Sequence, residues 1–408
     1  MSRLFVEIDN ILEDRDDLTN EFVANSLGIK EVTLRSIRRG ERNFTFYKLL
    51  KLSQIIDPSN PCAKINEWCL IFESTDCIKN SFEFAFATKN TKLLGELLAI
   101  HENSHGIVKE CYSIYSIIFQ ALTKEIEYSQ MIDELCKLKN IKDEPLLIVL
   151  NIYKLIRDLD NSKFGLAIDA GNDIAEKIKK ISKGNLFYKE CLTIRISEVL
   201  ARIHLYFNNL EMARYYSWKV INADANPKTT SDAYYILGYS YLMNDEEMCF
   251  HYLNKSKEYI EKTEFDFLVE IPKYNLDLAR FFLRQELSEN ADNSLQMAND
   301  FRQGLLSYED IKEVIENNGD NDLIKYCEGI REGSISNLYK AYRELIAEAN
   351  FYCASIIVKE LLLAGENSEF VKSLESLKFN QNKGDVLFEE ISSFSFGNCV
   401  GCRSGNAG

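Results

Sequence analysis

The sequence is poor in the two residues that interrupt helices. Its 408 residues include only 5 prolines and 18 glycines. Proline removes a backbone donor and glycine loses the most entropy on ordering, so both disfavour helix interiors. Segments in which Val, Thr or Ile alternate with polar residues, the pattern of a half-buried strand, are also scarce. Because Leu, Ile, Glu, Lys and Ala are abundant, the composition predicts an all-α protein.

Long apolar runs are missing as well. The longest are short stretches such as PLLIVL at 145–150, whereas a transmembrane helix needs about 20 apolar residues. The chain does not open with a cationic start, an apolar run and a small-residue cleavage site. We therefore expect no membrane partner and a cytoplasmic location.

The sequence offers little for metal binding or catalysis. Its 4 histidines are not suitably spaced, and its 11 cysteines are an odd number without a regular framework. Most cysteines lie in apolar helical stretches, as Cys111, Cys191, Cys249 and Cys353 do, which is typical of reduced core cysteines. No phosphate-binding glycine loop or nucleophile elbow occurs. We expect no metal, no cofactor and no enzymatic activity.

Positive charge is concentrated near the N-terminus of an otherwise acidic chain. The formal net charge is −15, yet the stretch LGIKEVTLRSIRRGERN at 27–43 holds five cationic side chains and two glutamates. Gly28 separates a short helix expected at 21–27 from a second helix expected at about 30–39, at a position suited to a left-handed turn. This arrangement predicts a helix-turn-helix, whose second helix enters the major groove of DNA.

Apolar residues of both short helices are expected to pack inward. They are Val23, Ala24, Leu27, Val32, Leu34 and Ile37. On the outer side, Lys30, Thr33 and Arg35 would reach base edges, and Glu31 could accept from a cytosine amino group. The later arginines are placed for phosphates, where counterion release drives affinity. The predicted DNA-binding set is Lys30, Glu31, Thr33, Arg35, Arg38, Arg39, Arg42 and Asn43.

The following segment, GERNFTFYKLLKLSQII, resembles the phage-repressor (XRE) helix-turn-helix family. In that family a Gly-x-Arg-Asn turn precedes a Leu-Leu-x-Leu helix. The matching residues here are Gly40, Arg42, Asn43, Leu49, Leu50 and Leu52. The chain departs from the pattern where Lys30 replaces a small polar residue at the start of the recognition helix. Without the resemblance, the alternative is a plain helical hairpin with a solvated basic edge.

From about residue 60 onward, one helical pattern follows another with an internal repeat. Residues 232–260 keep the spacing of a tetratricopeptide (TPR) repeat. In the unit before it, Leu200 and Ala201 stand where this one has Leu237 and Gly238, a step of 37 residues. Single units cannot bury their apolar faces, so they stack into a solenoid with a concave inner surface. We predict a TPR-like α-solenoid over 61–364, after a helix-turn-helix domain over 1–60.

The pattern changes twice near the C-terminus. A helix is expected to break at Gly365, and a second helix to begin after Asn367 or Ser368. Phe370, Leu374 and Leu377 fall at i, i+4 and i+7 and leave an apolar stripe. The stripe predicts a capping or dimerisation helix over 365–380, and hence a homodimer. The small, polar remainder, 381–408, is expected to be disordered.

The combined architecture looks like the arbitrium receptor family, AimR, of Bacillus temperate phages. The likeness covers roughly residues 15–380 and is strongest at LEMARYYS, YYILGYSYL and LLLAGEN. It implies a dimeric transcription regulator in a bacterial host cell that binds an operator and receives a short secreted peptide in its groove. In that family the peptide shifts the dimer away from its DNA-binding state and biases lysis against lysogeny.

The resemblance carries the peptide-binding residues over in part. Two family asparagines fall at Arg202 and Tyr206, and a basic contact residue falls at Lys228. A later asparagine matches Asn321, although counting back from Asn350 shifts this match by two. The family acid that pairs with the peptide's arginine falls at Asn350, and a neutral amide cannot form a bidentate ion pair. We therefore expect a different signal, or another partner for its arginine.

The physical requirements of a peptide site agree with part of this set. A short peptide offers backbone amides and a free carboxylate, and Arg202 and Lys228 could hold the carboxylate. For each residue the alternative is a solvated surface side chain.

Three other interpretations remain open. The protein could be a host regulator of the PlcR or NprR type, or a Rap-like sensor that acts by protein contact. The terminal RSGNAG, residues 403–408, has the size of a signalling peptide and could occupy the groove of its own chain.

Overall fold

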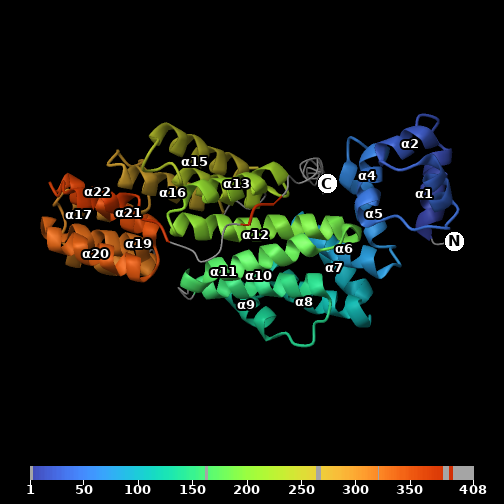
Figure 1. The fold of residues 1–408 in the computed structure, drawn as a ribbon, viewed down its shortest axis with the longest axis horizontal. Coiled ribbons are helices and arrows are strands. Elements are labelled where there is room, and N and C mark those ends of the chain that lie inside the picture. The colour runs from blue at the N-terminus through green and yellow to red at the C-terminus, as the bar shows by residue number, and fades with distance from the viewer. Residues whose placement is uncertain (1–2, 161–163, 263–267, 320, 380–385, 389–408) are drawn as a thin grey trace.

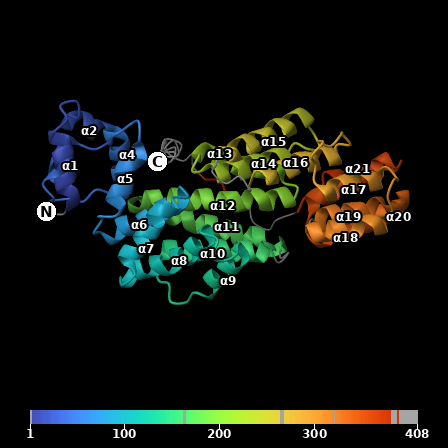
Figure 2. The same cartoon turned by 180° about the vertical axis from the view of Figure 1, so that it is seen from behind.

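The chain forms an elongated array of helices. The computed structural model describes residues 3–160, 164–262, 268–319, 321–379 and 386–388, and these ranges contain helices but no strands. This confirms the all-α prediction. Figure 1 shows an N-terminal bundle at one end, stacked helices in the middle and a compact C-terminal group at the other end. The view from behind shows the same order of parts (Figure 2).

The N-terminal bundle contains the two short helices that the sequence predicts. Its helices are α1 (Arg3–Glu13), α2 (Asn20–Ser26), α3 (Glu31–Arg38), α4 (Phe46–Ile56) and α5 (Pro61–Cys69). Gly28 turns the chain between α2 and α3 with a φ of +63°. Val23, Ala24, Leu27, Leu34 and Ile37 are buried, as predicted.

Val32 corrects one expectation, because its side chain is 77% exposed. At 100° per residue, Val32 lies about 200° around the helix from Leu34, and therefore on the opposite face. The bundle also includes α1, which the sequence analysis did not predict. The indole of Trp68 on α5 donates to Glu7 on α1 at 3.1 Å, so the fifth helix closes the bundle.

The middle of the molecule is the helical array. Its helices are α6 (Thr75–Ala87), α7 (Thr91–His101), α8 (Gly106–Leu122), α9 (Tyr128–Lys137), α10 (Glu144–Asp160), α11 (Phe164–Lys180), α12 (Leu186–Tyr206), α13 (Leu210–Ala223), α14 (Pro227–Tyr239), α15 (Glu246–Ile260) and α16 (Glu270–Phe282). Consecutive helices pack against one another. A Cβ on Gly238 would lie 2.9 Å from Leu253 and 3.1 Å from the carbonyl of Cys249. Glycine at 238 therefore permits the close approach of α14 and α15.

The C-terminal group consists of α17 (Asn293–Arg302), α18 (Tyr308–Asn318), α19 (Asn321–Ile330), α20 (Ile335–Ala347), α21 (Phe351–Leu363) and α22 (Glu369–Glu375). Gly365, with a φ of +95°, follows α21. The Ser368 hydroxyl accepts from the Val371 N–H at 3.3 Å and caps α22, as expected. Phe370 is 66% exposed and Leu377 is also exposed, whereas Leu374 is half-buried. The helix is shorter than predicted, because α22 ends at Glu375 and Leu377 lies beyond it, so only Phe370 and Leu374 of the predicted stripe share the helix.

A buried ionic network fixes the long helix α12 to α6. The Arg195 guanidinium donates to Glu83 at 2.6 Å, and the Tyr115 hydroxyl of α8 donates to the same carboxylate. Tyr188 of α12 lies 2.9 Å from the Tyr115 hydroxyl. Burial and the Glu83 carboxylate raise the pKa of Tyr115 well above its usual value. The network holds α12 in a defined position between the early and late helices.

The described cysteines are free thiols, and seven of these nine side chains are buried. Cys399 and Cys402 lie outside the described residues. No helix within the described ranges is long and apolar enough to span a membrane.

Candidate functional site

A pocket of about 280 Å³ opens between α12, α14 and α16. Its charged and polar lining residues are Glu198, Arg202, Lys228, Ser231, Asp232, Tyr235, Ser256 and Asn275. Its apolar and small lining residues are Ala201, Val220, Ala233, Ile236, Ile260, Leu268, Ile271 and Pro272. The pocket therefore combines charges of both signs with apolar surface, as sites for small peptides do.

Local sequence explains how α14 presents its side chains. Asn226 caps the helix by accepting from the Thr229 N–H at 2.9 Å, and Pro227 occupies the first turn. Lys228, Asp232 and Tyr235 then follow at i, i+4 and i+7, so they project from one face. All three side chains line the pocket.

The α14 backbone lies close to its neighbour α15. The Ser231 hydroxyl donates to the Ser256 carbonyl at 2.8 Å and lies 2.9 Å from the Ser256 hydroxyl. Small polar residues at both positions allow the two helices to approach, and the larger pocket side chains flank this contact.

The pocket contains two cations and two carboxylates. Lys228 forms an ion pair with Asp232, one turn along α14. Burial and the nearby Asp232 carboxylate raise the pKa of Glu198. Arg202 projects from α12 into the same pocket with its side chain exposed. An incoming carboxylate could therefore bind Arg202 and Lys228, while Glu198 and Asp232 could accept from ligand N–H groups.

Lys89, two residues beyond the end of α6, contributes to the same electrostatic environment. Its ammonium lies 4.0 Å from the centre of the Phe86 ring. Burial lowers the pKa of Lys89 to about 8, with Glu198 acting in the opposite direction and Lys228 in the same direction. No periodic pattern or motif in the sequence points to this residue.

The structure brings together only part of the predicted peptide-binding set. Arg202 and Lys228 line the same pocket although 26 positions separate them. Tyr206 lies one turn beyond Arg202 on α12 and is half-buried, but it does not line the pocket. Asn321 begins α19, and its side chain lies outside the described residues.

Asn350 corrects another expectation. Its side chain is only 3% exposed and caps α21 by accepting from the Cys353 N–H at 3.0 Å. The amide also donates to Asp322 at 2.9 Å. Asn350 is therefore a structural residue that links α21 to α19, and it does not face the pocket.

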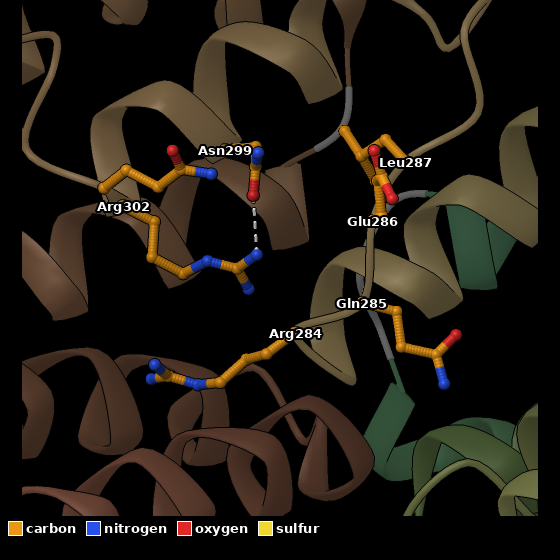
Figure 3. Close-up of a pocket in the computed structure, with 7 residues that line it drawn as sticks. Arg284, Gln285, Glu286, Leu287, Asn299 and Arg302 are labelled. Carbon is orange, nitrogen blue, oxygen red and sulfur yellow. Dashed lines mark hydrogen bonds between the residues drawn. The ribbon is translucent and has the colours of Figure 1, made fainter.

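A second pocket, of about 370 Å³, lies between the loop after α16 and helix α17 (Figure 3). Its two cations already have partners. Arg284 pairs with Glu360 at 2.5 Å, and Arg302 donates to Asn299 at 2.7 Å and to the Phe281 carbonyl. None of the predicted ligand residues lines it.

The other candidate surface is the outer face of α3 and the turn that follows. Residues 30–51 carry seven basic and two acidic side chains. Lys30, Arg42 and Asn43 are exposed, and Thr33 is half-exposed. Arg35 pairs with Glu31 at 2.6 Å, and Arg39 lies 3.8 Å from Glu41. These surface pairs are weak and can be replaced by contacts with phosphates.

Arg38 does not belong to this exposed set, which corrects its predicted phosphate contact. Only 18% of its side chain is exposed. The guanidinium binds Asp9 at 2.6 Å, Asn20 at 2.8 Å and Glu13 at 3.5 Å. Arg38 therefore joins α3 to α1 and α2 inside the bundle.

The model of the AimR transcriptional regulator-like family matches residues 63–362. The chain belongs to this family. The match confirms the resemblance stated from the sequence, and it begins within α5. No curated protein sequence matches the chain.

Two solved structures share the fold of this AimR-like chain. A selenomethionine form of phAimR has a TM-score of 0.54 and 19% identity, covering 91% of this chain and 100% of that one. A ligand-bound phAimR has a TM-score of 0.60 and 20% identity, covering 79% of this chain and 97% of that one. At these identities the likeness establishes an all-α, TPR-like fold.

Sequence reasoning missed several pocket residues of this AimR-like chain. Asp232 could have been found, since it stands four positions after Lys228 and faces the same way. Glu198 could have been found too, since it stands four positions before Arg202 on α12 and so shares its helix face. Tyr235, three positions after Asp232, could have been found in the same way. Asn275 had no such signal, because the pocket depends on how α12, α14 and α16 pack.

Proposed function

We propose that this chain is a peptide-responsive transcription regulator that binds double-stranded DNA through α3. The ligand is a short peptide held in the pocket between α12, α14 and α16. The observation that carries the proposal is the meeting of Arg202 and Lys228 in one pocket beside apolar surface. Membership of a regulator family and the likeness to a ligand-bound phAimR support it.

The pocket chemistry suits a peptide with a free C-terminus. Arg202 and Lys228 bind the terminal carboxylate, and the side-chain amide of Asn275 bonds a backbone amide group of the peptide. The exposed side chain of Ile271 provides an apolar contact for a ligand side chain. A neutral, apolar hexapeptide would satisfy these groups.

The outer face of α3 suits a DNA groove. Val32, Arg35 and Arg39 fall at i, i+3 and i+7, so they share a face that runs from the first turn of α3 to the residue just after its end. The arginines bind phosphates or base edges. Val32, which the protein leaves exposed, makes apolar contact with a thymine methyl group.

The wider role follows the family resemblance. The regulator acts as a cytoplasmic homodimer in a bacterial host, with Phe370, Leu374 and Leu377 at the contact between copies. Peptide binding in the pocket changes the spacing of the two α3 helices and lowers operator affinity. This control governs the choice between phage lysis and lysogeny.

A gel-shift titration with the intergenic DNA next to the gene tests the DNA part of the proposal. We expect binding at low salt that weakens steeply as salt rises. The variant Arg35→Ala/Arg39→Ala should bind more weakly, while Lys257→Ala, which removes a surface cation far along the chain on α15, should bind like the wild type. Absence of binding at low salt, or equal binding by all three proteins, would favour a sensor that acts by protein contact.

A further inference from the structure

We propose that α13 carries a second peptide-binding site, formed by Tyr215 and Tyr216, and that residues 386–388 of the same chain occupy it. The occupied site ties the chain that follows α22 to the helices that line the ligand pocket. The site is distinct from that pocket, which neither tyrosine lines.

Both tyrosines bind the main chain of the docked segment. The Tyr216 hydroxyl donates to the Val386 carbonyl at 2.7 Å. The Tyr215 hydroxyl donates to the Phe388 carbonyl at 2.9 Å and accepts from the Phe388 N–H at 2.8 Å. Main-chain bonds of this kind provide affinity for an extended segment whatever its side chains.

Side-chain burial alternates along the docked segment. Val386 and Phe388 are 6% and 8% exposed, whereas Leu387 between them is 56% exposed. An extended chain places successive side chains on opposite sides, so this alternation fits a strand-like segment lying on α13. The site therefore takes an extended segment with apolar residues at i and i+2. Residues 386–388 thus correct the prediction of disorder for this part of the tail, and the rest of 381–408 lies outside the described residues.

The segment just after α22 is held as well, by the end of α12. The Asn208 side-chain amide donates to the carbonyls of Glu375 at 3.3 Å and Leu377 at 3.1 Å. The Phe379 N–H donates to the Phe207 carbonyl at 3.1 Å, and the two rings stack with centroids 4.4 Å apart. These four contacts fix Glu375, at the end of α22, and the residues just after it to Phe207 and Asn208, which follow α12.

The anchoring helices are also pocket helices. Phe207 and Asn208 follow α12, whose residue Arg202 lines the pocket, and α13 places Val220 in the pocket one turn beyond Tyr216. The Tyr216 ring stacks on His204 of α12 at 5.4 Å. A displacement of α12 or α13 would therefore reach α22 through these contacts. A role in peptide control rests on the proposed function, but the binding site itself does not.

The test uses the full chain with Val386→Asp/Phe388→Asp, which expels the segment because a buried carboxylate without a partner is costly. The probe is a labelled peptide, GDVLFEE, whose sequence is that of residues 384–390. We expect saturable binding to this variant and at least about tenfold weaker binding to the wild type, whose own segment occupies the site. The control peptide GDDLDEE should not bind.

Adding Tyr215→Phe/Tyr216→Phe to the variant should weaken GDVLFEE binding by about tenfold, because two hydroxyl groups that bond its main chain are removed. Hydrogen exchange of the α22 amides should be faster in Val386→Asp/Phe388→Asp than in the wild type. Equal peptide binding by both proteins, or none to either, would overturn the site. Unchanged α22 exchange would overturn the tie to α22.

Discussion

At the scale of single residues, Arg35 and Arg38 show how neighbouring arginines can have different roles. They lie three positions apart on α3, but Arg38 binds Asp9 and Asn20 whereas Arg35 pairs with the surface carboxylate of Glu31. We predict that Arg38→Ala lowers Tm, because its half-buried partners would lose their hydrogen bonds. The expected loss in the free energy of unfolding is about 1–3 kcal/mol. Arg35→Ala should leave Tm nearly unchanged and reduce the salt dependence of DNA binding by about one ion. Thermal unfolding and DNA titrations at several salt concentrations measure both effects. A loss of Tm in Arg35→Ala but not in Arg38→Ala would contradict the two roles.

Val32 gives a prediction about operator sequence. After an operator has been selected from random DNA, each thymine is replaced in turn by uracil, which lacks the methyl group. Wild-type affinity should fall about threefold to fivefold at one thymine in each half-site. Val32→Ala should bind less tightly and lose this discrimination. If Val32→Ala still discriminates, or no thymine matters, Val32 makes no such contact.

The residue scale also shows what the sequence could and could not predict. Leu34 and Ile37 were predicted to be buried because they share a helix face, and the same geometry should have excluded Val32. The roles of Arg38 and Asn350 could not be read locally. Their partners Asp9 and Asp322 are 29 and 28 positions away, and no periodic pattern connects residues at such distances.

At the scale of helices, the Glu83–Arg195 pair is the main buried ionic link between α6 and α12. Glu83→Ala should destabilise the protein by about 3–5 kcal/mol, because Arg195 would remain buried without its carboxylate. The matched control is Glu176→Ala, which removes an exposed pair with Lys179 and should cost less than about 1 kcal/mol. Urea unfolding measures both, and similar losses in the two variants would contradict the prediction.

The end of α6 provides a pH-dependent prediction. The pKa of Lys89 is lowered to about 8 from 10.5, so above pH 8 the folded chain binds fewer protons than the unfolded chain. Stability therefore rises with pH between about 8 and 10.5, and the cost of charging Lys89 is fully present below this window. Relative to Lys89→Met, the wild type should gain Tm across this window. Parallel Tm curves for the two proteins would show that Lys89 has an ordinary pKa.

Most of the helical array was accessible from sequence. The 37-residue step predicted the repeats, and the small residue needed at Gly238 is explained by the approach of Leu253. The contact of residues 386–388 with α13 could not be predicted from the sequence. The Tyr216–Val386 contact spans 170 residues, and three extended residues leave no periodic signal.

At the scale of the whole molecule, the helices that line the proposed peptide pocket and the N-terminal bundle that contains α3 lie in different parts of an elongated chain (Figure 1). Communication between them must pass through packed helices, with α12 in contact with both α4 and α14. Two equilibria linked in this way affect each other reciprocally. The peptide should therefore weaken DNA binding by the same factor by which DNA weakens peptide binding.

The proposed dimer contact gives a further prediction at this scale. The exposed Phe370 on α22 would be covered by a second copy. Phe370→Asp should shift sedimentation from dimer to monomer at micromolar concentration without lowering Tm. The matched control is Leu166→Asp, which changes an exposed leucine on α11, in the middle of the molecule, and should leave the dimer intact.

The most direct measurement is operator affinity with and without the peptide encoded by a small reading frame beside the gene. The peptide is compared as the free acid and as the C-terminal amide, on wild type and on Arg202→Ala/Lys228→Ala. The free acid should lower wild-type affinity for DNA by at least about fivefold. The amide should act weakly, and the variant should bind DNA normally but ignore the peptide. An equal effect of acid and amide, or a full response in the variant, would contradict peptide control through this pocket.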